Sequence, residues 1–262
     1  MAPGSANAAN VFNLKDRVAL ITGASSGLGE RFAEVAAANG ASVVLTARRE
    51  DRLKEIAARI EKSGGKAAYA VCDVTDNASV ARAFDTAEKK FGTVDLFVAN
   101  AGMARLGKVT DMPEADYRQL MATDMDSVFF NSREAANRMI AANKGGAIIT
   151  TASIAAFMVE RNIVAYNMAK AAVVQFTKGF ALEVARKNIR VNAIAPGYVV
   201  TEINRDFLLS PKGQEGMQRL PIQRYGEVDD LDGVFLLLAS NASRWMTGST
   251  IVIDGGQLLT AG

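Results

Sequence analysis

Short apolar segments alternate with longer amphipathic segments along almost the whole chain, and this alternation restricts the fold strongly. The apolar segments are residues 17–22, 41–47, 66–73, 94–100, 147–152, 189–195 and 250–254. Runs of this length and composition are typical of buried strands, and the stretches between them have the periodicity of helices. The pattern predicts an α/β fold, with a doubly wound parallel sheet of about seven strands and helices on both faces.

Composition indicates one large domain over residues 14–262, preceded by a loose polar tail at residues 1–13. Of the 262 residues, 49% are apolar, which is enough for a sizeable core. The 30 basic and 28 acidic residues are spread along the chain. A nucleic-acid partner is not expected, because binding one would need a concentrated basic patch.

Two residue counts exclude whole classes of chemistry. The chain has no histidine, which rules out Ser-His and Cys-His hydrolases. Its single cysteine, Cys72, cannot form an intrachain disulfide, and we expect no metal site and a buried thiol. No apolar run reaches the roughly 20 residues of a membrane span, and the first dozen residues lack the features of a signal peptide. The sequence therefore predicts a soluble cytoplasmic protein.

A glycine-rich turn follows the first predicted strand and leads into a helix. Gly23 allows a tight turn, Gly27 lets the backbone approach a pyrophosphate, and Gly29 allows close packing of helix and strand. The free N–H groups at the helix start are then available to phosphates. The spacing differs from the common Gly-x-Gly-x-x-Gly fingerprint, so a turn without a ligand remains an alternative. The predicted cofactor-binding residues here are Gly23, Ser25, Ser26, Gly27, Leu28 and Gly29.

The second predicted strand ends at Ala47 and is followed by Arg48 and Arg49. An acidic residue at this point would bind the free 2′-hydroxyl of an adenosine ribose, whereas an arginine suits a 2′-phosphate. We therefore expect NADP(H) in preference to NAD(H). The alternative is an arginine that starts a helix and points to water.

Other candidate residues also follow predicted strands. Asp73 and Val74 are expected beside the adenine, and Asn100, Ala101 and Gly102 follow the fourth strand. Ligands of such sheets bind at the carboxyl ends of the strands. The coincidence of candidates at strand ends therefore supports a nucleotide site more strongly than any one motif. Residues 202–225 are expected to form an irregular active-site lid.

Ser153, Tyr166 and Lys170 form a candidate catalytic group. Tyr166 and Lys170 are four residues apart on a predicted helix and share a face, while Ser153 follows the fifth strand. A free phenol has a pKa of about 10, and a nearby ammonium favours the phenolate. The three groups suit proton transfer at a carbonyl oxygen, with the hydride supplied by a cofactor. Taken alone, Tyr-x-x-x-Lys also fits an amphipathic helix with a solvated lysine.

Taken together, these motifs resemble the short-chain dehydrogenase/reductase family, in its compact single-domain branch. The resemblance covers about residues 14–258 and includes Pro196-Gly197 and Asp254-Gly-Gly256. It implies a Rossmann-type fold, a nicotinamide cofactor and hydride transfer to or from a carbinol or carbonyl carbon. By position, it implies that Tyr166 is the general acid/base, that Ser153 binds the substrate oxygen, and that Lys170 lowers the tyrosine pKa and holds the nicotinamide ribose. It also implies that Asn100 supports the cofactor and the central strand. Residues 196–201, with Pro196, Gly197, Val199 and Thr201, would embrace the nicotinamide and its phosphate side.

One position departs from the family pattern. A long helix predicted from about residue 116 to 143 carries Asp124, where relatives have an asparagine that helps to hold a proton-relaying water. We expect Asp124 to accept from that water and to pair with Lys170. Its charge would partly offset the effect of the lysine on the tyrosine, and so move the pH optimum upward relative to Asp124→Asn.

The predicted activity is that of an NADP(H)-dependent carbonyl reductase or alcohol dehydrogenase. Its partner is a small carbonyl or alcohol substrate, and Met103, Phe157 and Tyr198 join Ser153 as candidate substrate-binding residues in an apolar pocket. The alternatives are an NAD-dependent dehydrogenase of the same family and a cofactor-binding scaffold without catalysis. The resemblance also implies a homotetramer, or a homodimer.

Overall fold

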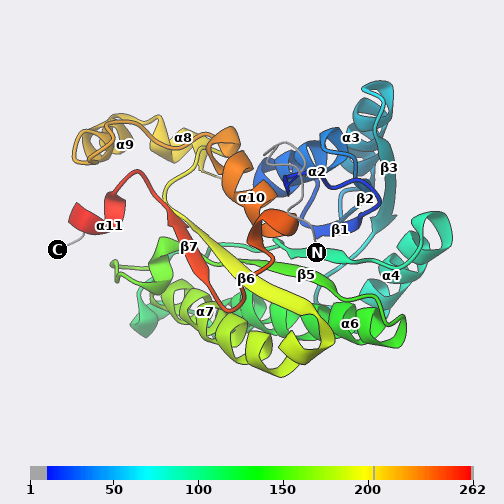
Figure 1. The fold of residues 1–262 in the computed structure, drawn as a ribbon. Helices are drawn as coiled ribbons and strands as arrows, with labels where there is room; N and C mark the ends of the chain where they lie inside the picture. Colours follow the sequence, from blue (N-terminus) through cyan, green and yellow to red (C-terminus); the bar gives the residue numbers. More distant parts are fainter. Residues whose placement is uncertain (1–10, 203, 261–262) are drawn as a thin grey trace.

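The computed structural model describes residues 11–202 and 204–260, and within them the chain forms a parallel sheet of seven strands (Figure 1). The spatial order is β3-β2-β1-β4-β5-β6-β7, and each neighbouring pair is parallel. The strands are β1 (Val18–Thr22), β2 (Ser42–Ala47), β3 (Lys66–Val71), β4 (Leu96–Ala99), β5 (Gly146–Thr151), β6 (Ile189–Pro196) and β7 (Thr250–Ile253). The predicted doubly wound α/β fold is therefore confirmed.

Helices cover both faces of the sheet (Figure 1). One face carries α2 (Gly27–Ala38), α3 (Glu50–Lys62) and α10 (Asp232–Ala239), and there Phe32 stacks on Phe235 with ring centroids 4.7 Å apart. The other carries α4 (Asn77–Phe91), α6 (Ser127–Ala141) and α7 (Val164–Val184). Because both faces are buried, the central strands are almost entirely apolar, and Cys72 is buried as expected.

The strand order places the two halves of the sheet side by side at β1 and β4. The chain moves outward from β1 through β2 to β3, then returns to β4 on the other side of β1. The strand order therefore reverses between β1 and β4, and ligands of such sheets bind in the crevice outside the carboxyl ends of the strands at this point. This is where the glycine-rich turn and Asn100 lie.

The helix predicted over residues 116–143 is present from residue 114 to 141, but one turn in its middle is π-helical, which the sequence did not predict. The structure has α5 (Glu114–Met121), then a π-helical turn η2 (Ala122–Asp126), then α6. In a π-helical turn each hydrogen bond spans one more residue than in an α-helix, and such turns are frequent at functional sites. Asp124 lies in the middle of this turn and is completely buried.

The segment predicted to be irregular contains two short helices, α8 (Arg205–Leu208) and α9 (Pro211–Met217). Ser210 caps α9 by accepting from the N–H of Gly213, and Pro211 occupies its first turn. The Tyr225 hydroxyl donates to the Gly213 carbonyl at 2.5 Å. The short elements are η1 (Val109–Asp111), η3 (Ile154–Ala156), η4 (Ala185–Lys187), η5 (Val228–Leu231), η6 (Asn241–Ser243) and α11 (Gln257–Thr260).

Most of the predicted N-terminal tail, residues 1–10, lies outside the described residues. Among the described helices, not one combines the length and the apolar character that crossing a membrane requires.

Candidate active site

The glycine-rich turn between β1 and α2 is packed against the loop that follows β4. A Cβ added to Gly23 would lie 2.9 Å from the Ala101 Cα, and one added to Gly29 would lie 2.4 Å from the Gly23 carbonyl oxygen. Both distances are too short for any real side chain. Glycine is therefore required at both positions by the close packing of the turn, and the binding of a pyrophosphate here stays a prediction.

Gly29→Ala is expected to lower the free energy of unfolding by about 1–3 kcal/mol, because the added methyl group forces the backbone apart. Gly233 provides the matched control: it too lies in a helix, and nothing lies within 4 Å of the position of its Cβ. Gly233→Ala should leave stability unchanged or raise it by up to about 1 kcal/mol. Urea denaturation of both variants measures the difference, and equal stability would contradict the close packing.

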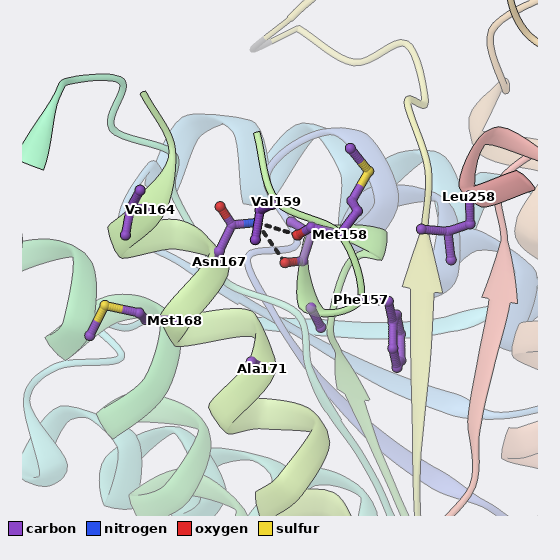
Figure 2. A pocket seen from close by; sticks show the side chains of 10 residues that line it. Phe157, Met158, Val159, Val164, Asn167, Met168, Ala171 and Leu258 are labelled. Atoms are coloured by element: carbon purple, nitrogen blue, oxygen red, sulfur yellow. Dashed lines mark hydrogen bonds between the residues drawn. The ribbon is translucent and has the colours of Figure 1, made fainter. Parts of the chain in front are cut away.

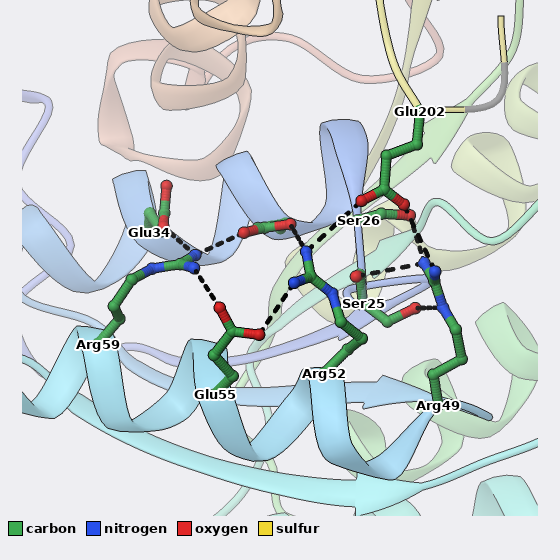
Figure 3. A network of polar contacts seen from close by, with 9 residues as sticks. Ser25, Ser26, Glu34, Arg49, Arg52, Glu55, Arg59 and Glu202 are labelled. Atoms are coloured by element: carbon green, nitrogen blue, oxygen red, sulfur yellow. Dashed lines mark hydrogen bonds and ion pairs between the residues drawn. The ribbon is translucent and has the colours of Figure 1, made fainter.

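Arg49 reaches the glycine-rich turn (Figure 3). Its guanidinium donates to the Ser25 Oγ at 3.2 Å, the Ser25 carbonyl at 3.3 Å and the Ser26 Oγ at 2.7 Å. Arg48 is exposed, and its charge helps to lower the pKa of Asp73, after the larger effect of hydrogen bonds from Thr75. The structure thus brings Arg49 to the turn.

Asn100 holds the crevice together. Its Nδ2 donates to the Thr22 carbonyl at 3.0 Å, and its backbone N–H donates to the Thr22 Oγ1 at 2.9 Å. The Thr151 Oγ1 donates to the Asn100 Oδ1 at 3.5 Å. One asparagine therefore ties together the carboxyl ends of β1, β4 and β5, in line with its predicted structural role.

Ser153 follows β5 and begins the short helix η3, whose residues pack against α7. The Ser153 Oγ accepts a hydrogen bond from the Ala155 N–H at 3.1 Å. Because the bond uses an oxygen lone pair, the hydroxyl hydrogen is left available to donate to a bound oxygen. Asn167 secures this segment to α7 by donating to the carbonyls of Ala155 at 2.6 Å and Met158 at 2.9 Å.

Lys170 is buried and is held from two sides. Its Nζ donates to the Thr151 carbonyl at 3.1 Å and lies 3.1 Å from the Asp124 Oδ2. The same Nζ lies 5.4 Å from the centroid of the Tyr166 ring. Burial is the largest single influence and by itself lowers the pKa of Lys170, but the interactions with Asp124 and Tyr166 together outweigh it, so that the pKa of Lys170 is raised. The lysine is therefore a fixed positive charge beside the tyrosine.

Asp124 uses both of its oxygens. Oδ2 pairs with Lys170, and Oδ1 accepts from the Met103 N–H at 2.7 Å. The loop passes so closely that a Cβ added to Gly102 would lie 3.1 Å from the Asp124 Oδ2. The expected pairing of Asp124 with Lys170 is present. The bond to Met103 was not predicted, because it involves a backbone N–H that no sequence pattern reveals.

The segment after β6 covers the crevice from the other side. A Cβ added to Gly27 would lie 3.3 Å from the Thr201 Cγ2, so residue 201 sits directly against the glycine-rich turn. Tyr198 donates to the Glu160 Oε2 at 3.1 Å, and burial together with this carboxylate raises the pKa of Tyr198 to about 12. Gly197 packs so tightly against Asp254 that a Cβ would lie 2.8 Å from the Asp254 Cα. The contact between Tyr198 and Glu160 was not predicted, because the two residues lie 38 positions apart in the chain.

A groove of about 810 Å³ lies along α7 (Figure 2). Val164, Asn167, Met168 and Ala171 line it at helical spacing, whereas Tyr166 and Lys170 occupy another stripe of the helix. Phe157 lines this groove and is 49% exposed. Its predicted contact with substrate stays a prediction.

The geometry as a whole can hold a nucleotide and move a proton. The crevice between β1 and β4 offers bare backbone and two serine hydroxyls, with arginines beside them. The Ser153 hydroxyl lies between the end of β5 and η3, and the Tyr166 phenol and the Lys170 ammonium lie on α7, which packs against η3.

Comparisons with known proteins agree with this geometry. The family model described as "Enoyl-(Acyl carrier protein) reductase" matches residues 23–257. The gluconate 5-dehydrogenase of Gluconobacter oxydans is 33% identical, over 94% of this chain and 96% of that protein. Two solved structures are also similar. The gluconate 5-dehydrogenase of Burkholderia cenocepacia in complex with NADP and tartrate has a TM-score of 0.91 and 36% identity, over 96% of this chain and 99% of that one.

The second structure is a 7α-hydroxysteroid dehydrogenase complexed with NADH and 7-oxo glycochenodeoxycholic acid. It has a TM-score of 0.90 and 34% identity, over 94% of this chain and 96% of that one. These similarities span nearly the whole sheet and its helices, and the family model begins at Gly23, the first glycine of the turn. The chain belongs to the short-chain dehydrogenase/reductase family.

Proposed function

We propose that this protein is an NADP(H)-dependent oxidoreductase that moves a hydride between the nicotinamide and the carbon of a ketone, aldehyde or secondary alcohol. The observation that carries the proposal is the buried Lys170, held by Asp124 and Thr151 with its ammonium 5.4 Å from the Tyr166 ring. A buried ammonium in this position has no packing advantage over an apolar side chain, whereas it favours the phenolate during proton transfer.

Each residue then has a defined task. In the reducing direction, the Tyr166 hydroxyl gives its proton to the substrate oxygen, and in the oxidising direction the phenolate takes it back. The Ser153 hydroxyl donates a hydrogen bond to the same oxygen. The Lys170 Nζ donates one N–H to the Thr151 carbonyl and forms an ion pair with Asp124, and a further N–H would bind the nicotinamide ribose. The nicotinamide, when bound, supplies or accepts the hydride.

The residues around the crevice fit such a cofactor. Gly23, Gly27 and Gly29 keep side chains away from the backbone at the start of α2, where free N–H groups would bind a pyrophosphate. Asp73 and Val74 flank the adenine site, and residues 100–102 and 196–201 line the nicotinamide side. Preference for NADP(H) rests on Arg48 and Arg49, because a guanidinium binds a phosphate through paired charge-assisted hydrogen bonds. The similar gluconate 5-dehydrogenase with bound NADP supports a preference for NADP(H). The similar steroid dehydrogenase with bound NADH supports the alternative, a preference for NAD(H).

We extend the proposal to the assembly and location of the protein, as a cytoplasmic homotetramer or homodimer. The outer surface of α6 and α7 exposes several large apolar side chains, which a second copy would cover. These include Phe129, Phe130, Val164, Met168 and Leu182.

The test of the function is cofactor oxidation with a panel of ketones and aldehydes that includes keto-sugar acids and oxo-steroids. We expect turnover with NADPH at a higher kcat/KM than with NADH. Arg48→Ala should reduce kcat/KM for NADPH by roughly 10- to 100-fold, because one charge-assisted hydrogen bond is lost, and should leave NADH almost unaffected.

Arg118→Ala is the control for a general loss of positive charge, because Arg118 is exposed and pairs with Glu114 within α5. Equal losses for NADPH and NADH in Arg48→Ala would contradict the proposed phosphate contact. A higher kcat/KM with NADH in the wild type would identify an NAD-dependent dehydrogenase. Binding of NADPH without turnover on any compound of the panel would favour a non-catalytic role.

A further inference from the structure

Glu202 places a carboxylate beside the arginines expected to bind the cofactor phosphate (Figure 3). Its Oε2 lies 3.4 Å from the Arg49 Nη1, and its Oε1 lies 3.5 Å from the Arg52 Nη2. The two arginines come from the start of α3, whereas Glu202 comes from the segment that follows β6. The carboxylate therefore bridges two walls of the nucleotide crevice.

The backbone around Glu202 is anchored on both sides, so its position is set by the fold. Thr201 packs against Gly27, and the Thr201 N–H donates to the Asn204 Oδ1 at 2.8 Å. The Asn204 Nδ2 in turn donates to the Val199 carbonyl at 2.8 Å. Glu202 is thus kept next to the glycine-rich turn.

Arg49 is equally constrained. Three hydrogen bonds to Ser25 and Ser26 direct its guanidinium toward the turn, and within the described part of the chain Glu202 is its one carboxylate partner. Arg52 differs, because it also pairs with Glu55 at 2.9 Å and Glu30 at 3.7 Å. Losing Glu202 therefore leaves Arg52 paired but frees the charge of Arg49.

We propose that Glu202 is an internal competitor for the cofactor's 2′-phosphate and so sets the strength of the preference for NADP(H) over NAD(H). A phosphate monoester carries about −1.5 to −2 charges at pH 7 and seeks the same guanidinium. To reach the Arg49 guanidinium, the phosphate must either displace the Glu202 carboxylate or bind beside it against its negative charge, and both cost binding free energy. A ribose with a free 2′-hydroxyl carries no charge there, so NAD(H) binding has neither cost. The inference rests on the proposed NADP(H) function, since it concerns the phosphate that distinguishes the two cofactors.

The test uses two nucleotide fragments, adenosine 2′,5′-bisphosphate and 5′-AMP, which share the adenosine and the 5′-phosphate and differ in the 2′-phosphate. Their Kd values are measured by calorimetry at low salt, with the full-length protein. We expect Glu202→Gln to bind the bisphosphate about three- to tenfold more tightly than the wild type does, because exposed ion pairs each shift an equilibrium by up to about fivefold. Binding of 5′-AMP should change by less than about twofold.

Glu55→Gln is the matched control. It removes the same charge from the same network, but Glu55 pairs with Arg52 and Arg59 and not with Arg49. Both fragments should bind this variant as they bind the wild type. An unchanged or weaker affinity of Glu202→Gln for the bisphosphate would overturn the inference, and so would an equal gain in Glu55→Gln. The role of Glu202 is judged from the ratio of the Kd of Glu202→Gln to the Kd of the wild type for the bisphosphate. The preference for NADP(H) is judged separately, and a wild type that binds both fragments equally would count against it.

Discussion

Tyr166→Phe is expected to reduce kcat by roughly 10³-fold with any carbonyl substrate that the wild type turns over. The substitution removes a single oxygen, and with it the group that exchanges a proton with the substrate. General acid–base catalysis typically contributes about 10²- to 10⁴-fold. Single-turnover oxidation of NADPH measures the loss directly, because it separates the chemical step from cofactor release.

Tyr117→Phe is the control for this substitution. Tyr117 lies in α5 and packs into the same apolar cluster as Tyr166, next to Leu120 and Ala169. Removing its hydroxyl should leave kcat within about twofold of the wild type. Retention of more than a tenth of wild-type activity in Tyr166→Phe would assign the proton transfer to another group.

Asp124→Ala is expected to destabilise the protein by about 3–5 kcal/mol. The substitution leaves the ammonium of Lys170 buried, with the Thr151 carbonyl as its remaining partner, and removal of one member of a buried ion pair carries a cost of this size. Asp126→Ala is the matched control, because Asp126 belongs to the same π-helical turn but is only half-buried. Urea denaturation of the two variants should separate them clearly, and equal stabilities would show that the pair contributes nothing.

Asp124→Asn tests the catalytic side of the same pair. Without the carboxylate, the positive charge of Lys170 acts undiminished on the phenol of Tyr166, and the pH optimum should fall relative to the wild type. An unchanged or higher optimum would contradict this role.

The pH dependence of stability should follow a different pattern. Because Asp124 raises the pKa of Lys170 above 10.5, the stabilisation by the pair is fully present below that pH and is lost only as the pH rises through the raised pKa. The stability difference between wild type and Asp124→Asn should therefore stay constant from about pH 7 to 9.

The features that the sequence predicted best are those that follow from periodicity. The strands were recognisable as apolar runs, because a parallel sheet with helices on both faces buries every position, and the spacing of Tyr166 and Lys170 placed them on one helical stripe. Even the departure at Asp124 could be interpreted, because an acid opposite a lysine has an obvious partner. The structure confirms that pairing at 3.1 Å.

The contacts that could not be predicted are those between residues far apart in the sequence, which only the folded chain brings together. The Thr151 carbonyl and the Met103 N–H, which orient Lys170 and Asp124, are backbone groups with no sequence signature. The approach of Glu202 to Arg49 joins residues 153 positions apart in the chain. Of two adjacent arginines, the sequence could not show which one reaches the serines of the turn. The structure brings Arg49 there.

The π-helical turn at residues 122–126 has a consequence for how this chain can change. The turn puts α5 and α6 out of phase by about one residue, or roughly 100° of rotation about the helix axis. Deleting one residue, such as Ala122, would let the two helices join in regular hydrogen bonding. The same shift of phase would rotate Asp124 away from Lys170 or carry α5 around to a different face. A regular α-helix through residues 122–126 and the contact of the Asp124 carboxylate with Lys170 are therefore incompatible. The fold keeps the contact and, with it, the π-helical turn.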